Sequence, residues 1–116
     1  MTKTETYLNQ LPASVQQKFT PLFGDVSTFY QVAYLIVRNE HYLSLNPNEQ
    51  SGINQDIIRM LIYKLKDLVK PMGLDGKKIM NDIHLEYMED YKADTVQDVH
   101  IEDARFIEIV QHISTL

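Results

Sequence analysis

Hydrophobic residues recur along this chain at intervals of three and four, which is the spacing of one face of an α-helix. The pattern predicts a short helix at about 4–10. A second helix starts at Pro12 and stops or kinks near Phe19, because Pro21 cannot continue it. Longer helices are expected at about 25–45, 54–70, 75–91 and 101–114, with a loop at 92–100.

The segment at about 25–45 is apolar on nearly every side. One face carries Val26, Phe29, Ala33, Ile36 and Val37, and most of the remainder carries Tyr30, Val32, Tyr34 and Leu35. A helix that is apolar all round is usually surrounded by other helices. We therefore predict an all-α fold, a single helical domain over 1–116, in which four to five amphipathic helices form a bundle around this hydrophobic central helix.

Capping and breaking residues stand where the periodic pattern starts and stops. Short polar side chains accept hydrogen bonds at helix starts, whereas Gly and Pro end helices. The expected caps are Asp25 or Ser27, Ser51 or Asn54, and Asp75, and the expected breaks are Gly24, Asn46-Pro47-Asn48 and Pro71-Met72-Gly73.

Composition excludes several classes of protein. The chain has 116 residues and no cysteine, so disulfides, thiolate metal sites and cysteine nucleophiles are ruled out. No signal peptide is visible, and no apolar run is long enough to cross a bilayer. These features predict a cytoplasmic protein without a membrane segment.

Charge is distributed unevenly along the chain. Residues 82–103 carry eight carboxylates and one cation, a charge of −7, whereas the whole chain carries −5. Like charges at this density repel one another unless they face solvent or a basic partner. This segment is therefore the main clue to function.

The carboxylates of the predicted fourth helix form a stripe. Asp82, Glu86 and Glu89 are spaced by four and three, and Asp90 lies on the flank of that line. Lys77 and Lys78 come a turn earlier, so we expect no paired lysine and a stripe that lies outside the packed interior. We predict a small non-enzymatic inhibitor, immunity-type or regulatory protein that binds a basic macromolecular partner through Asp82, Glu86, Glu89, Asp90, Asp94 and Asp98.

A divalent-cation or small-ligand site is an alternative for the loop. Asp94, Asp98, His100 and Glu102 are ligand types that metal ions accept. An EF-hand beginning at Asp90 does not fit, because Thr95 stands where that loop needs glycine and Ile101 where it needs glutamate. Arg105, Glu108 and His112 are interpreted as a surface ion-pair ladder.

A second alternative is nucleic-acid binding through the predicted third helix. Arg59, Tyr63, Lys66 and Lys70 fall on one stripe opposite its apolar face. The net negative charge of the chain repels nucleic acid, so nucleic acid is a less favoured partner than a basic protein. The same stripe complements the acidic one, which leaves open a homodimer in which each copy docks on the other.

The motifs of catalysis are missing from the sequence. It contains no nucleophile elbow, phosphate loop or dinucleotide fingerprint. The chain has seven tyrosines, and a buried tyrosine usually packs its ring and finds one hydrogen-bond partner; we place Tyr63 outside the core. We therefore predict no enzymatic activity and no cofactor.

Overall fold

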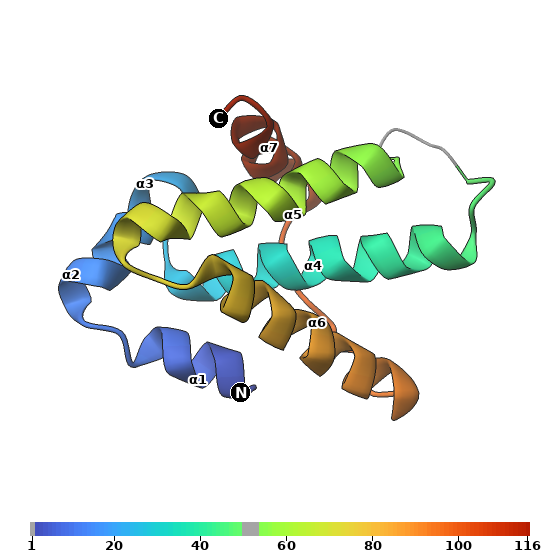
Figure 1. Ribbon diagram of the computed structural model, residues 1–116, viewed down its shortest axis with the longest axis horizontal. Helices are drawn as coiled ribbons and strands as arrows, with labels where there is room; N and C mark the ends of the chain where they lie inside the picture. The colour runs from blue at the N-terminus through green and yellow to red at the C-terminus, as the bar shows by residue number, and fades with distance from the viewer. Residues whose placement is uncertain (1, 50–53) are drawn as a thin grey trace.

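The helix α4 (Val26–Leu45) forms the centre of the molecule, as the sequence pattern predicts. The computed structural model describes residues 2–49 and 54–116. In Figure 1, α4 runs between α5 (Gln55–Val69) and α6 (Gly76–Lys92), and both pack against it. The residues of α4 that are buried to 3% exposure or less are Val26, Phe29, Tyr30, Val32, Ala33, Tyr34, Ile36 and Val37.

The all-α prediction is confirmed, although the helices outnumber the four to five expected. The additional helices come from residues 3–23, where Pro12 precedes α2 and Pro21 is the second residue of α3. These prolines divide the segment into short pieces. The elements there are α1 (Lys3–Asn9), α2 (Ala13–Gln16), the 3₁₀-helix η1 (Gln17–Phe19) and α3 (Thr20–Phe23).

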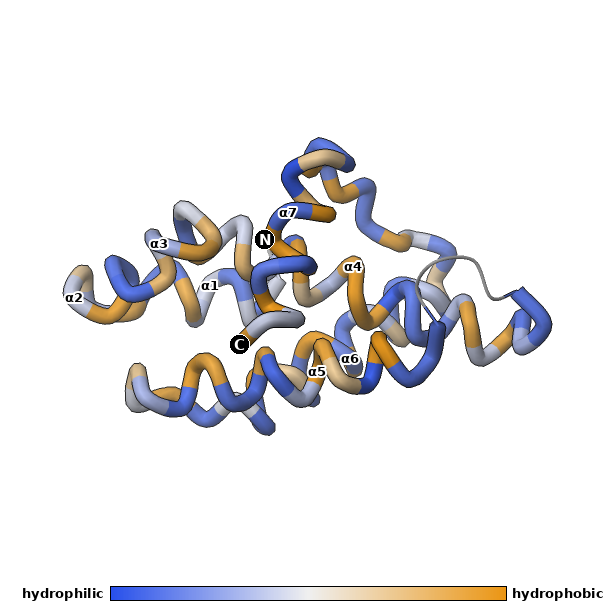
Figure 2. The backbone as a smooth tube through the Cα atoms, turned by 90° about the horizontal axis from the view of Figure 1, so that it is seen from above, coloured by the Kyte–Doolittle hydropathy of each residue, from blue (hydrophilic) through white to orange (hydrophobic). Residues whose placement is uncertain are grey.

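The short helices still contribute to the core. Leu8 of α1, Phe19 of η1 and Phe23 of α3 are each exposed by 1% or less. The rings of Phe19 and Phe23 lie 5.0 and 5.1 Å from that of Phe29 on α4, within the usual range of aromatic pairs. Figure 2 shows hydrophobic and hydrophilic positions alternating along α5.

The helices α4, α5 and α6 begin at the expected polar caps. Asp25 accepts a hydrogen bond from the backbone N–H of Thr28, and Asn54 accepts one from Ile57. Asp75 caps α6 in the same way. Ser51, the other candidate cap for α5, lies outside the described residues.

Left-handed residues end α5 and α6. After α5, the 3₁₀-helix η2 (Lys70–Met72) leads into Gly73, at φ 83°. After α6, Asp94 takes the same role at φ 57°, and the N–H of Thr95 reaches back to the carbonyl of Asp90 at 2.8 Å. The left-handed conformation is unfavourable for a residue with a Cβ. Asp94 is therefore strained at the end of α6, whereas Gly73 adopts this conformation after α5 without strain.

The start of α6 lies directly against the backbone of α5. A Cβ added to Gly76 would stand 2.3 Å from the carbonyl oxygen of Lys66. Only glycine allows this close approach, and it brings the acidic helix next to the helix that carries the basic stripe.

The last helix, α7 (Asp103–Ser114), packs on α5 after the irregular segment 93–102. Its residues Ile109, Val110 and Ile113 are buried. The ammonium of Lys64 donates to the carbonyl oxygens of Ser114 and Leu116, both at 2.8 Å, and so holds the end of α7 to α5. None of the helices in residues 2–49 and 54–116 is long and apolar enough to span a membrane.

Candidate functional site

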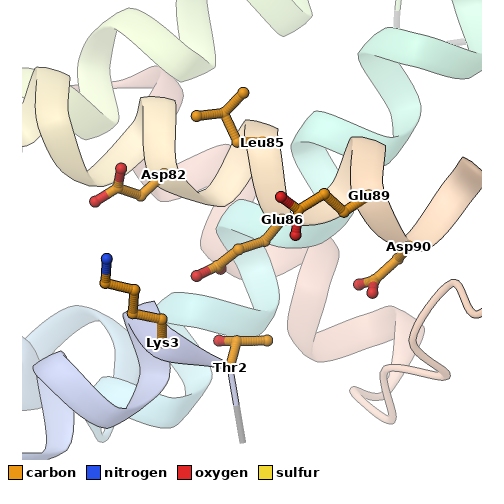
Figure 3. Close-up of a pocket in the computed structure, with 7 residues that line it drawn as sticks. All are labelled: Thr2, Lys3, Asp82, Leu85, Glu86, Glu89 and Asp90. Carbon is orange, nitrogen blue, oxygen red and sulfur yellow. The ribbon is translucent and has the colours of Figure 1, made fainter.

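The acidic stripe of α6 lines a surface hollow of about 340 Å³ between α6 and the start of α1. Figure 3 shows four carboxylates of α6 on one side and the first residues of α1 on the other. Its lining residues are Thr2, Lys3, Asp82, Leu85, Glu86, Glu89 and Asp90. The four helical carboxylates predicted to act together therefore do share one site.

Two of these carboxylates face inward and are part of the packing. Glu86 Oε1 accepts hydrogen bonds from the backbone N–H and the hydroxyl of Thr4, at 2.9 and 2.7 Å. Its Oε2 accepts a third from the Tyr30 hydroxyl at 3.2 Å. The carboxylate thus satisfies a backbone N–H in the first turn of α1, where the helix dipole favours negative charge.

Asp90 makes the corresponding contact one turn later. Its Oδ2 accepts hydrogen bonds from the Tyr34 hydroxyl at 2.9 Å and from the side-chain amide of Gln97 at 3.3 Å. The backbone N–H of Gln97 donates to that same Tyr34 hydroxyl at 3.1 Å. Asp90 therefore ties α6 both to the central helix and to the 93–102 segment.

The tyrosines opposite these carboxylates are held in the neutral form. Burial raises the pKa of Tyr34 to about 12, and the hydrogen bond to Asp90 acts in the same direction. Burial also raises the pKa of Tyr30, and the negative charge of Glu86 raises it further. Neutral hydroxyls remain donors to the carboxylates at neutral pH. We call the contacts of Glu86 and Asp90 with Thr4, Tyr30, Tyr34 and Gln97 the seam.

The expectation that the whole stripe lies outside the interior is therefore wrong for Glu86 and Asp90, which we call the inner pair. Tyr30 and Tyr34 are 1% and 0% exposed, and their hydroxyls reach out of the core to meet these carboxylates. A carboxylate can flank an apolar face when a buried hydroxyl or N–H satisfies it.

Asp82 and Glu89, the outer pair, lie on the solvent side of the hollow. The expectation of no paired lysine is wrong for Asp82, because the Lys78 ammonium stands 2.9 Å from its Oδ2. Lys78 is four residues earlier on the helix, which brings the two side chains together. Glu89 is exposed and makes no ion pair within the part of the chain that the structure describes. Glu89 therefore carries the most available charge of the stripe.

The other two predicted partner-binding residues stand apart from the hollow. Asp94 is exposed and serves as the left-handed residue that ends α6. Asp98 is exposed, and its Oδ2 lies 3.4 Å from Nε2 of His100. Neither lines the hollow, so the structure groups four of the six predicted acidic residues and not these two.

The predicted cation site does not assemble. Over residues 2–49 and 54–116, no three His, Asp or Glu side chains come close enough to hold a metal ion. Asp98 and His100 form an exposed pair, and the structure does not bring Asp94 and Glu102 to join them. The predicted ladder on α7 holds in part, since Arg105 pairs with Glu108 at 3.1 Å.

The basic stripe lies on the outer surface of α5. Arg59 and Lys70 are exposed, Lys66 is partly exposed, and Tyr63 is exposed by 67%, as expected. Lys66 also lines a second hollow of about 250 Å³, between α4, α5 and α6. In the described part of the chain none of the three cations makes an ion pair.

Sequence reasoning missed the part of the site contributed by α1. Thr2 and Glu5 form a reciprocal capping box, in which each side chain accepts a hydrogen bond from the other's backbone. The pattern Thr2-x-x-Glu5 is the sequence signature of such a helix start, and it could have placed the start of the predicted first helix at Lys3. Nothing local in the sequence indicates that α1 packs beside residue 86.

Comparisons with known proteins do not extend this picture. No family model matches the sequence, and no significant similarity to a curated protein or to a solved structure was found. The case for a function therefore depends on the hollow and on the charges around it.

Proposed function

We propose that this is a non-enzymatic cytoplasmic protein that binds a basic macromolecular partner at the hollow between α1 and α6. The observation that carries the proposal is the grouping of Asp82, Glu86, Glu89 and Asp90 in one concave surface. An inhibitor, an immunity-type factor or a regulatory subunit would each use such a surface.

The inner and outer pairs have different tasks in this proposal. Glu86 and Asp90 are already hydrogen-bonded, so they shape the hollow and add to its negative potential. Glu89 is free to meet a cation, and Asp82 can exchange its exposed lysine for a cation of the partner. Exposed ion pairs contribute about 0.2–1 kcal/mol each, so several must act together, and their field mainly accelerates association.

A fluorescently labelled octa-arginine peptide provides a direct test by anisotropy. Asp82→Asn with Glu89→Gln should weaken binding about fivefold at low salt, as expected for two exposed charge contacts. The matched control is Asp98→Asn with Glu102→Gln, which removes the same charge outside the hollow. Equal weakening by both double variants would show that only net charge matters and would overturn the assigned site.

Capture of the natural partner is the complementary experiment. Asp82→Lys with Glu89→Lys should abolish retention of the partner by the immobilised protein and leave the fold intact, because both side chains are outside the packed seam. Glu86 must be left unchanged, since its reversal would also break the contact with Thr4. Unchanged capture at both low and high salt would contradict the proposal.

A further inference from the structure

The outer surfaces of α5 and α6 share one face of the molecule. The two helices pack directly against each other as well as against α4. The second hollow lies between them, lined by Glu40 of α4, Lys66 of α5, and Asn81 and His84 of α6, among others. Together α5, this hollow and α6 form what we call the α5–α6 face.

One edge of this face is basic. Arg59, Lys66 and Lys70 are spaced by seven and four residues, so they follow one line along α5. Lys66 lies in the hollow toward α6, which places that line on the α6 side of the helix. The exposed ring of Tyr63 stands beside it. Glu40 is the one carboxylate among the residues that line the hollow.

The other edge of the face is acidic. Asp82 and Glu89 lie on the far flank of α6, toward α1, where they line the first hollow. Leu85 is three residues after Asp82 and four after Asn81, so it stands between the acidic edge and the second hollow. Leu85 is exposed by 59%, which leaves an apolar contact point at the middle of the face.

We propose that the α5–α6 face docks onto the same face of a second copy of this chain. A two-fold axis in the plane of contact, running beside Leu85, would set the basic edge of each copy against the acidic edge of the other. Every favourable charge contact is then made twice, and the two Leu85 side chains meet near the axis. The contact rests on the proposed function, because it uses the same outer pair.

The charges of this face are complementary to those of a second copy. A partner with only basic residues would pair with the acidic edge alone and would leave Arg59, Lys66 and Lys70 without a counter-charge. A copy of this chain satisfies both edges at once. Lys78 pairs with Asp82 on its own helix, so Glu89 carries the unpaired charge of the acidic edge, and Asp82 contributes by exchanging its lysine for a cation of the other copy.

Sedimentation velocity of the purified protein tests self-association in the absence of any other partner. We expect a concentration-dependent dimer whose dissociation constant rises at least about tenfold when salt is raised from 0.05 to 0.5 M, because screening weakens exposed charge contacts. A monomer at all concentrations and salts would overturn the proposal.

Charge-swapped variants identify the surface. The acidic variant carries Arg59→Glu, Lys66→Glu and Lys70→Glu; the basic variant carries Asp82→Lys and Glu89→Lys. Each alone should be monomeric, since both of its edges then have one sign, and an equal mixture should form a heterodimer. Lys18→Glu on η1, outside this face, should leave the dimer unchanged. Far-ultraviolet circular dichroism and thermal melts establish that each variant is folded.

The mixture separates this proposal from the proposed function. If the mixed variants do not associate, or if each associates alone as the wild type does, the second copy is excluded as the occupant of this face. If the wild type binds octa-arginine, the proposed function is supported whether or not the protein dimerises. If the wild type forms the dimer but does not bind octa-arginine, only the self-docking proposal is supported.

Discussion

The inner and outer carboxylates of α6 are of the same residue types and on the same helix, and Glu89 lies within three residues of both Glu86 and Asp90, yet the two pairs have opposite surroundings. Glu86 and Asp90 meet hydroxyls that project from buried tyrosines, whereas Glu89 meets solvent and Asp82 meets an exposed lysine. In a charge stripe beside an apolar face, the carboxylates that meet polar groups of the core are therefore bound within the protein, and the others remain free. The number of acidic residues in a sequence thus overstates the negative charge that is available to a partner.

Removing one carboxylate from the inner pair and one from the outer pair should change the free energy of unfolding by very different amounts. Glu86→Ala leaves the N–H and hydroxyl of Thr4 and the hydroxyl of Tyr30 without their acceptor, so we expect a loss of about 2–3 kcal/mol in the free energy of unfolding. Glu89→Ala should change it by less than about 0.5 kcal/mol. Urea unfolding at pH 7 measures both, and equal losses would contradict the division.

A second substitution removes the inner contact from the opposite side. Tyr34→Phe keeps the ring in the core but deletes the donor to Asp90 and the acceptor for Gln97, at an expected cost of about 1–2 kcal/mol. Tyr91→Phe is the matched control, because that ring is 46% exposed and its hydroxyl has no recorded partner among the described residues. A loss as large in the control would rule out a special role for the seam.

Alkaline pH should weaken the same contact without any mutation. The pKa of Tyr34 is raised to about 12 in the folded protein, against 10 in the unfolded chain. Between these values the unfolded chain releases the proton first, so stability is full below pH 10 and falls as pH rises toward 12. Unfolding measured across this range should show a shallower fall for Tyr34→Phe, and parallel curves would refute the contribution of Tyr34.

A smaller effect concerns the acidic residue that ends α6. Asp94→Gly should raise stability by about 0.5–1 kcal/mol, since glycine adopts the left-handed conformation without strain. Asp98→Gly removes the same charge at a position without positive φ and should lower stability by a few tenths of a kcal/mol, because glycine gains entropy in the unfolded chain. Thermal melts distinguish them, and an equal shift in both would assign the effect to charge.

The smallest change in the free energy of unfolding is expected for the ion pair between Lys78 and Asp82. Lys78→Ala breaks the contact with Asp82 on a surface where the lysine is 70% exposed, and the cost should stay below about 0.5 kcal/mol. A loss comparable to that of Glu86→Ala, measured in the same urea titration, would place Asp82 with the inner pair.

The fold was largely predictable from the sequence because its signals are local. Asp25, Asn54 and Asp75 mark helix starts through bonds to residues three positions on, and the apolar surface of 25–45 identifies the central helix. The division of the acidic stripe was not predictable, because Tyr30 and Glu86 are 56 residues apart and meet only after α1, α4 and α6 have packed. The hollow has the same origin, since one of its walls begins at Thr2.

The capping of α1 by Glu86 has a practical consequence for laboratory work. Whatever polypeptide is joined ahead of Thr2 emerges at the rim of the acidic hollow, where an affinity tag rich in histidine or lysine would compete with the ligand being sought. Bait protein for capture and ultracentrifugation should therefore carry its tag after Leu116, on the far side of α5.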